Sequence, residues 1–368
     1  MSDITSYEID FLPVGNGDRS GDAITVRWKD GNNFKVLVYD GGTQQSGQEL
    51  VDHIKKHYGT DTIDYLVNSH PDADHASGLS IVLDQLNVKE VWIHRPWEYS
   101  AIIRDYFHDG RITDASLAER LKSKMAAAYA IEELALEKNI SIHEPFQGCQ
   151  IGPFTVLSPE KDWYIHDLIP AFAKSPEQKT VVAEATGRIL ISFAEGLRKV
   201  ADWIAEKWDG ESLREDVETS AENESSVILF SIFGTRGILL TGDAGVETLD
   251  RAATYATALG HDLPNLLRFV QIPHHGSRNN VSTSILDRII GARKPIDDGE
   301  YTKTAYISAA KGSTTHPRKM VVNAFLRRGT RVVATQGQSK CFYVDMPPRD
   351  GWVSATPLTF STEVESWN

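Results

Sequence analysis

The stretch Ser69-His70-Pro71-Asp72-Ala73-Asp74-His75 constrains the fold of this 368-residue chain more than any other. It follows the run Ile63–Val67, and an apolar, β-branched run that ends at a polar turn with proline is typical of a buried strand entering a loop. Such loops carry the chemistry of α/β proteins. Turns favour Asp and tolerate His, but no turn requires so many potential ligands together. Imidazoles and carboxylates suit Zn, Mn or Fe, and here they are His70, Asp72, Asp74 and His75.

Length and composition limit the classes of protein to which this chain can belong. The chain is long enough for one elaborated domain or for a domain with an insertion. It has no run of eighteen apolar residues, and Met1–Thr5 lacks the features of a signal peptide, so we expect a cytoplasmic protein without a membrane segment. Two distant cysteines, Cys149 and Cys341, provide neither a disulfide framework nor a thiolate metal site. Any metal must therefore be bound by His and carboxylates.

The formal net charge of −13 restricts the ways in which the chain can bind nucleic acid. A protein that coats nucleic acid non-specifically needs many Lys and Arg contacts to phosphate. A nuclease remains compatible with this charge, because metal ions and a local basic patch can hold the phosphates at a scissile bond.

Periodicity predicts two similar halves. The first half alternates apolar and polar residues as a β-meander does, and a helix over 49–57 then leads to the strand that precedes the polar loop. Asp40 ends the third predicted strand. Strands of the first half are expected at 7–11, 23–28, 34–39, 63–67 and 88–93. In the second half we expect a helix at 318–328 and strands at 225–232, 238–241, 269–272, 304–309 and 331–335.

Between these halves the pattern is mainly helical. Ser116 and Glu119 resemble a capping box, and an apolar face predicts one long helix from there to Asn139. A strand is expected at 154–158, and the acidic stretch 211–224 is typical of a solvated surface. We therefore expect 1–94 and 221–368 to be the two halves of one fold and 95–220 to be an inserted, mainly helical cap.

The motif His70-Pro71-Asp72-Ala73-Asp74-His75 resembles the signature loop of the metallo-β-lactamase superfamily, in the form in which Asp replaces the second His. Leu240-Thr241-Gly242-Asp243 and Pro273-His274-His275-Gly276-Ser277 match two later motifs. The set is most similar to the hydrolase domain of ComEC-type DNA-uptake proteins and their free-standing relatives, whose Gly-Gln-Gly-Asp turn is similar to Val14–Asp18 here. The resemblance implies a four-layer αββα sandwich, two divalent metal ions, Zn or Mn, and a Val14–Asp18 turn that borders their pocket.

The resemblance also implies roles for individual residues. Metal ligands would be His70, Asp72, Asp74, His75, Asp243 and His274, with Asp243 between the two ions. Asp40 would brace the signature loop, and the residues expected to act directly in catalysis are Asp72, Asp74, His275 and His316. Candidate substrate contacts are Ser277, Ser308, Lys311 and Arg318, with Lys319 beside them. The His that usually completes the first metal site has no counterpart. Asn223 lies near its expected place, and the oxygen-rich site that results favours Mn.

The expected activity is hydrolysis by a hydroxide held between two metal ions. The leading substrate class is a phosphodiester in a nucleic acid or a nucleotide, which makes the chain a phosphodiesterase or nuclease. Two alternatives stay open: an acyl hydrolase acting on a lactone, thioester or amide, and a non-catalytic binding module of the same fold.

Overall fold

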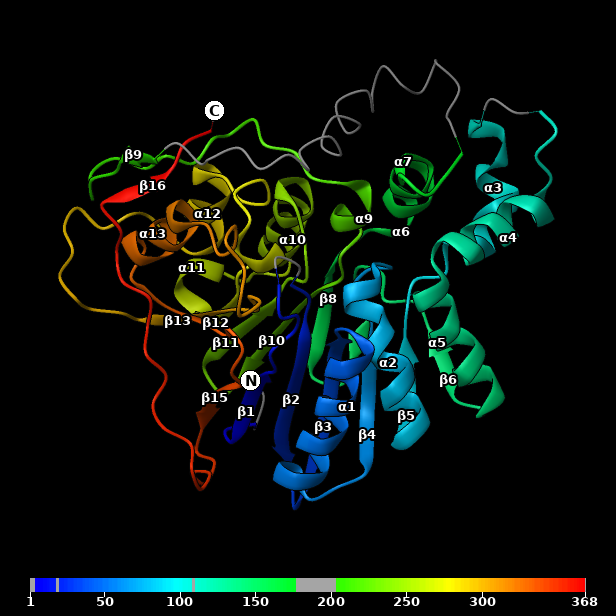
Figure 1. Ribbon diagram of the computed structural model, residues 1–368, viewed down its shortest axis with the longest axis horizontal. Helices are drawn as coiled ribbons and strands as arrows, with labels where there is room; N and C mark the ends of the chain where they lie inside the picture. Colours follow the sequence, from blue (N-terminus) through cyan, green and yellow to red (C-terminus); the bar gives the residue numbers. More distant parts are fainter. Residues whose placement is uncertain (1–3, 18–19, 108–109, 177–202, 368) are drawn as a thin grey trace.

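The computed structural model describes residues 4–17, 20–107, 110–176 and 203–367 (Figure 1). Two seven-stranded sheets form its centre. The strands of the first sheet are, in spatial order, β15 (Lys340–Val344), β1 (Tyr7–Phe11), β2 (Ala23–Asp30), β3 (Asn33–Gly41), β4 (Thr62–Val67), β5 (Asn87–Trp92) and β6 (Ser141–His143). Those of the second sheet are β14 (Thr330–Ala334), β13 (Lys303–Ile307), β12 (Leu267–Gln271), β11 (Arg236–Leu240), β10 (Ile228–Phe233), β8 (Phe154–Ser158) and β7 (Gln150–Ile151).

Each sheet has an antiparallel part and a parallel part. In the first sheet, β15, β1, β2 and β3 pair antiparallel, and β3 to β6 pair parallel. In the second, β7, β8, β10 and β11 pair antiparallel, and β11 to β14 pair parallel. Parallel strands are covered on both faces. This explains why their sequences read as nearly continuous apolar runs, which the sequence analysis placed correctly.

Four layers result from this arrangement. Apolar side chains fill the space between the two sheets, among them Phe11, Trp28, Phe154, Phe233 and Phe269. One helical layer covers the first sheet with α1 (Gln44–His53), α2 (Ala73–Gln85) and α5 (Ala126–Glu137); another covers the second with α10 (Val246–Ala258), α11 (Leu263–Leu266), α12 (Thr283–Ile289) and α13 (Lys319–Arg327). In Figure 1, α10 to α13 lie on one side of the strands and α2 and α5 on the other. The predicted αββα sandwich is therefore confirmed.

The region predicted as a cap, 95–220, is partly built into the sandwich. β6 extends the first sheet, and β7 and β8 extend the second, so residues 141–158 belong to the two sheets. The remaining helical elements described in this region are η2 (Pro96–Tyr99), α3 (Ser100–Ile103), η3 (Arg104–Tyr106), α4 (Asp114–Lys124), α6 (Lys161–Trp163), η4 (Tyr164–Leu168) and α7 (Ile169–Ala171). Residues 177–202 of the predicted cap lie outside the described residues.

The single long helix expected after Ser116 is two helices, α4 and α5. They are separated at Met125, whose φ of −113° and ψ of 40° lie outside the helical region. The capping box also lies earlier than predicted. Thr113 is the N-cap of α4, and its hydroxyl accepts from the amide of Ser116 at 3.1 Å, while the hydroxyl of Ser116 accepts from the amide of Thr113 at 2.9 Å.

The acidic stretch is only partly the solvated surface that was predicted: Glu215, Asp216 and Glu218 are exposed, whereas Glu222 and Glu224 are buried. The side chain of Glu211 is 1% exposed and lies 2.7 Å from Arg328. A few residues before the stretch, Oε1 of Glu206 lies 2.8 Å from a guanidinium nitrogen of the fully buried Arg327. Carboxylates here neutralise two arginines at the end of α13, because a buried guanidinium without a partner is costly.

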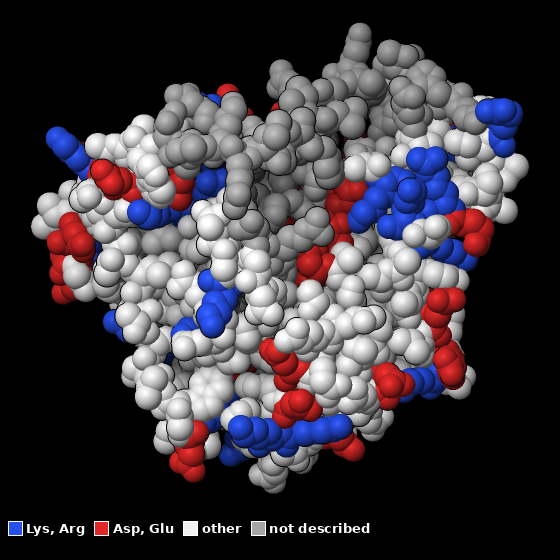
Figure 2. Space-filling view, in the orientation of Figure 1, with Lys and Arg blue, Asp and Glu red and all other residues white. Residues whose placement is uncertain are grey.

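Short elements complete the fold: η1 (Ile54–Tyr58), α9 (Ala221–Glu224), η6 (His274–Gly276), and a two-stranded sheet of β9 (Trp203–Ala205) and β16 (Glu363–Glu365). None of the described helices is both long and apolar enough to cross a bilayer. On the face drawn in Figure 2, basic and acidic side chains are interspersed, and Lys and Arg gather at the upper right, over α4.

Candidate metal centre

The loops that follow four strands meet at one edge of the sandwich. Asp40 is part of β3, the signature loop follows β4, Asp243 follows β11, and the pair His274–His275 follows β12. Polar residues at strand ends can converge in this way because the carboxyl ends of parallel strands face the same edge. Asp40, His274 and His275 adopt φ of 60°, 45° and 57°. Such values are uncommon outside glycine and cluster at functional sites.

Four imidazoles surround the carboxylate of Asp243. Each presents its Nε2 atom to the same oxygen, Oδ2 of Asp243. The distances are 3.3 Å for His75, 3.7 Å for His274, 3.7 Å for His275 and 3.9 Å for His70. These rings come from two different sheets, so the centre lies across the sandwich.

Asp40 fixes the two imidazoles of the signature loop. Its Oδ2 lies 2.9 Å from Nδ1 of His75 and accepts the hydroxyl of Ser69 at 2.5 Å, while its Oδ1 accepts the amide of Ser69 at 2.7 Å. Ser69 Oγ in turn lies 2.9 Å from Nδ1 of His70. Because that hydroxyl hydrogen goes to Asp40, Ser69 Oγ accepts from His70. Nδ1 of both rings therefore carries a proton, so in the neutral form of either ring the lone pair of Nε2 faces the centre.

The other two imidazoles are held in the same way. Nδ1 of His275 donates to the carbonyl of Ser308 at 3.0 Å, and Nδ1 of His274 donates to Oδ1 of Asn280 at 2.9 Å. Asn280 also donates to the carbonyl of Asp243 at 2.8 Å. Every ring that faces Asp243 thus has its orientation fixed from behind.

The centre has buried polar atoms that only a further ligand can satisfy. Nε2 of His70, Nε2 of His75 and Oδ1 of Asp243 are buried without a hydrogen-bond partner. Each such atom costs about 1–3 kcal/mol when it stays unpaired. Four sets of ligand atoms at the centre each lie within 4.8 Å of one another: Asp40, His70 and His75; Asp74, His75 and His275; Asp243, His274 and His275; and Asp22, His75 and Asp243. Nitrogen and carboxylate donors so arranged fit divalent transition metals.

Asp22 was missed by the sequence analysis, which placed the turn bordering the pocket at Val14–Asp18. Asp18 lies outside the described residues. Asp22 is 1% exposed; its Oδ2 lies 3.8 Å from Nδ1 of His75 and accepts from Nε2 of Gln271 at 2.8 Å. The available signal was Gly21 before Asp22, directly ahead of β2. A Cβ at Gly21 would come within 2.0 Å of the carbonyl oxygen of Asp74, so only glycine fits against the signature loop.

Burial and charge set the protonation states of the metal-free centre. Burial lowers the pKa of His275 to about 4 and also lowers that of His70, so both rings are neutral near pH 7. Burial opposes protonation of His75 as well, but Asp243 and Asp40 outweigh it and raise its pKa well above the usual value. Metal binding at His75 must therefore release a proton, which makes affinity fall as pH falls.

Comparison with known proteins finds a family model that matches part of the chain. Residues 17–124, which include the signature loop, match the family model of the metallo-beta-lactamase superfamily. Over these residues the chain is similar to the metallo-β-lactamase superfamily. Members of this superfamily are generally metal-dependent hydrolases. A comparison with curated proteins gives no match.

Several solved structures are similar to this chain at low sequence identity. Unliganded yeast PDE1 is 11% identical, with 91% of this chain and 99% of that chain covered and a TM-score of 0.43. The metallo-β-lactamase fold protein YhfI from Bacillus subtilis is 8% identical over 92% and 99%, with a TM-score of 0.38. A metallo-β-lactamase from Hirschia baltica is 14% identical over 73% and 85%, with a TM-score of 0.30.

The structure brings the residues predicted as ligands of this superfamily centre together and adds His275. Asp72 Oδ2 lies 3.8 Å from Nε2 of His70. His275, predicted to act on substrate, shares one ligand set with Asp74 and His75 and another with Asp243 and His274. Asn223, near the place of the missing His, has its amide nitrogen 3.1 Å from Nδ1 of His274 and 2.7 Å from Thr219 Oγ1. It therefore lies behind His274.

The residues predicted to contact substrate are more dispersed. The ring of His316 is nearly parallel to that of His274 at 6.2 Å, and burial lowers its pKa to about 3. Lys311 packs its aliphatic carbons against Gly337. The ammonium of Lys319 lies over the ring of Trp203 at 4.3 Å.

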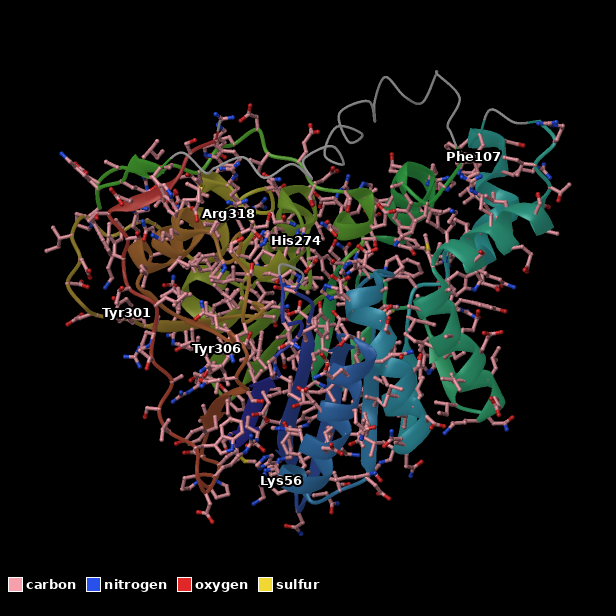
Figure 3. All side chains as sticks on the ribbon, in the orientation of Figure 1. Lys56, Phe107, His274, Tyr301, Tyr306 and Arg318 are labelled. Atoms are coloured by element: carbon pink, nitrogen blue, oxygen red, sulfur yellow. The ribbon has the colours of Figure 1, made fainter. Side chains whose placement is uncertain are left out.

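The remaining predicted substrate contacts use backbone or local hydrogen bonds. Ser308 contributes its carbonyl to His275, and Ser277 Oγ accepts from the amide of Asn279 at 3.2 Å. The amide of Arg318 donates to the carbonyl of Gly276 at 3.0 Å. Figure 3 shows Arg318 and His274 near each other above the strands.

Proposed function

We propose that this protein hydrolyses phosphodiesters, in a nucleic acid or a nucleotide, at a centre for two divalent ions, Zn or Mn. The observation that carries the proposal is the convergence of four fixed imidazole Nε2 atoms on one oxygen of Asp243, at 3.3 to 3.9 Å. The Nε2 atoms of His70 and His75 are buried without a hydrogen-bond partner, which costs stability unless a ligand binds them. They are suited to metal ligation.

We assign residues to two ions. Asp74, His75 and His275 would hold one ion. His70 and Asp72, whose Nε2 and Oδ2 atoms lie 3.8 Å apart, would hold the other, and His274 would be a further nitrogen donor beside Asp243. Asp243 would be shared by the two. Two such ions lower the pKa of bound water and neutralise charge on attacking and leaving oxygens.

Side chains of this protein would orient the imidazoles and exchange protons with the substrate. Asp40, Ser308 and Asn280 keep the rings in the tautomer that faces the centre. The side chain of Asp72 is 33% exposed, so this ligand carboxylate can exchange a proton with substrate or solvent. His316, neutral near pH 7, can accept a hydrogen bond beside His274.

A phosphodiester is the substrate class that fits this scheme best. A two-ion site stabilises both oxygens of an in-line displacement at phosphorus. The order of the motifs, with the His274–His275 pair at the last position, is similar to that of ComEC-type hydrolase domains, which supports the same class.

The test is a substrate panel with protein loaded with Zn or Mn. It contains single- and double-stranded DNA, RNA, cyclic dinucleotides, a chromogenic phosphodiester and lactones. We expect metal-dependent cleavage of at least one phosphodiester. The variant His75→Ala should be folded, lose at least one metal equivalent by elemental analysis and lose activity. Turnover of lactones alone would indicate an acyl hydrolase, and no turnover by the metal-loaded parent would indicate a binding module.

A further inference from the structure

The side chain of Lys174 reaches the metal centre from the region after α7. Its ammonium contacts Oδ1 of Asp72, while the other oxygen of that carboxylate faces His70 at 3.8 Å. Among the described residues, Lys174 is the one Lys or Arg with an ion pair to any carboxylate of the centre. The ammonium therefore lies next to a predicted metal ligand.

The backbone around Lys174 is fixed on several sides. Its amide donates to Oε1 of Glu222 at 3.4 Å, and its carbonyl accepts from Nε of Arg120 at 3.5 Å. The following residue, Ser175, is buried and donates its hydroxyl to the carbonyl of Ile169 at 2.7 Å. The fold therefore fixes the backbone from which the Lys174 side chain extends to Asp72.

Lys174 is also accessible to a ligand. Its side chain is 26% exposed, and that of Asp72 is 33% exposed. By contrast, Asp40 and Asp243, deeper in the centre, have side chains that are 0% and 5% exposed. The pair formed by Lys174 and Asp72 is therefore the part of the centre where a bound molecule can meet both a cation and a metal ligand.

We propose that Lys174 binds a non-bridging phosphate oxygen of the substrate at the Asp72 side of the centre. This inference rests on the proposed function. An anionic substrate approaches a chain of net charge −13 and a centre rich in carboxylates, so a local cation is needed to offset the repulsion. An ammonium supplies a charge-assisted hydrogen bond to such an oxygen. The predicted cations Lys311 and Lys319 have no contact of this kind with the centre.

The experiment measures binding of inorganic phosphate to Mn-loaded protein by calorimetry, together with turnover of a chromogenic phosphodiester and of a neutral lactone. Lys174→Met removes the charge with little change of volume, and Lys174→Arg keeps the charge. Lys138→Met is the matched control, because Lys138 pairs with Asp84 at 3.8 Å near the other end of α2, with a side chain 34% exposed.

We expect Lys174→Met to weaken phosphate binding by about 10- to 100-fold, the effect of losing one hydrogen bond to a charged group. Metal content should equal that of the parent, and the lactone rate, where present, should not change. Lys174→Arg should recover most of the affinity, and Lys138→Met should behave as the parent.

Two results would overturn the inference. One is phosphate affinity in Lys174→Met equal to that of the parent. The other is a loss of metal in Lys174→Met, which would make Lys174 a structural partner of Asp72. Failure of the proposed function is separate: it appears as a parent that cleaves no phosphodiester, even if its phosphate affinity depends on Lys174.

Discussion

The variant Asp40→Asn tests whether the hydrogen bonds behind the imidazoles control metal binding. The carboxylate of Asp40 accepts from His75, from the hydroxyl and amide of Ser69, and from Asn68 at 3.2 Å. An asparagine has one acceptor oxygen and an amino group that only donates. In the Asp40→Asn variant, the amino group must replace one of the two carboxylate oxygens. Its hydrogens then face the N–H or O–H groups that donated to that oxygen.

The expected loss follows from the position of His75. If the amino group faces Nδ1 of His75, the ring must move its proton to Nε2, the atom 3.3 Å from Asp243. A protonated Nε2 cannot ligate. Loss of such an outer partner typically weakens metal affinity by 10- to 100-fold, which is about 1.4–2.7 kcal/mol. If the amino group instead takes the place of Oδ1, it faces the amide of Ser69 and the hydrogen bond from that amide is lost, which loosens the signature loop.

The assay is competition for Zn between the protein and a chromogenic chelator, for the parent and the variant. Asp64→Asn is a suitable control, because Asp64 is also a buried carboxylate, which accepts from the amide of Val36 at 3.0 Å and pairs with Lys35 and Lys89. It should keep the metal affinity of the parent. Equal affinity for Asp40→Asn and the parent, with both proteins folded, would refute the reasoning.

Three further predictions concern activity and stability. His316→Ala should lower phosphodiester turnover by about 10- to 1000-fold, the scale of one transition-state contact, and Lys311→Ala should have a smaller effect; equal rates in His316→Ala and the parent would exclude His316. Glu206→Ala should cost about 3–5 kcal/mol of unfolding free energy in urea, because it leaves the buried Arg327 without its 2.8 Å partner; a cost below about 1 kcal/mol would contradict this. Burial raises the pKa of Glu224 from 4.5 to about 7, so the stability it contributes is complete below pH 4.5 and is lost as pH rises to about 7. Glu224→Gln should therefore gain up to about 3 kcal/mol relative to the parent between pH 4.5 and pH 8, and a pH-independent difference would show that Glu224 does not titrate in this range.

Residues close together in the sequence were the ones that could be predicted. The strands and the signature loop were placed correctly because alternation and apolar runs reflect which faces of a strand are buried, and that depends on a few neighbouring residues. Errors arose at a local level where several signals compete. Thr113 and Ser116 both suit the N-cap of α4. The sequence near Met125 contains no glycine or proline that would predict the break between α4 and α5.

The sequence by itself determined the αββα class and most of the candidate ligands, since both depend on short motifs and their order. Only the tertiary structure decided which groups meet. Asp22 joins His75 from before β2, Asn280 fixes His274, and Lys174 reaches Asp72 across 102 positions of the chain. Such contacts depend on how the two sheets pack and on where the loops between strands cross the edge of the sheets. The periodicity of the sequence carries no information on either.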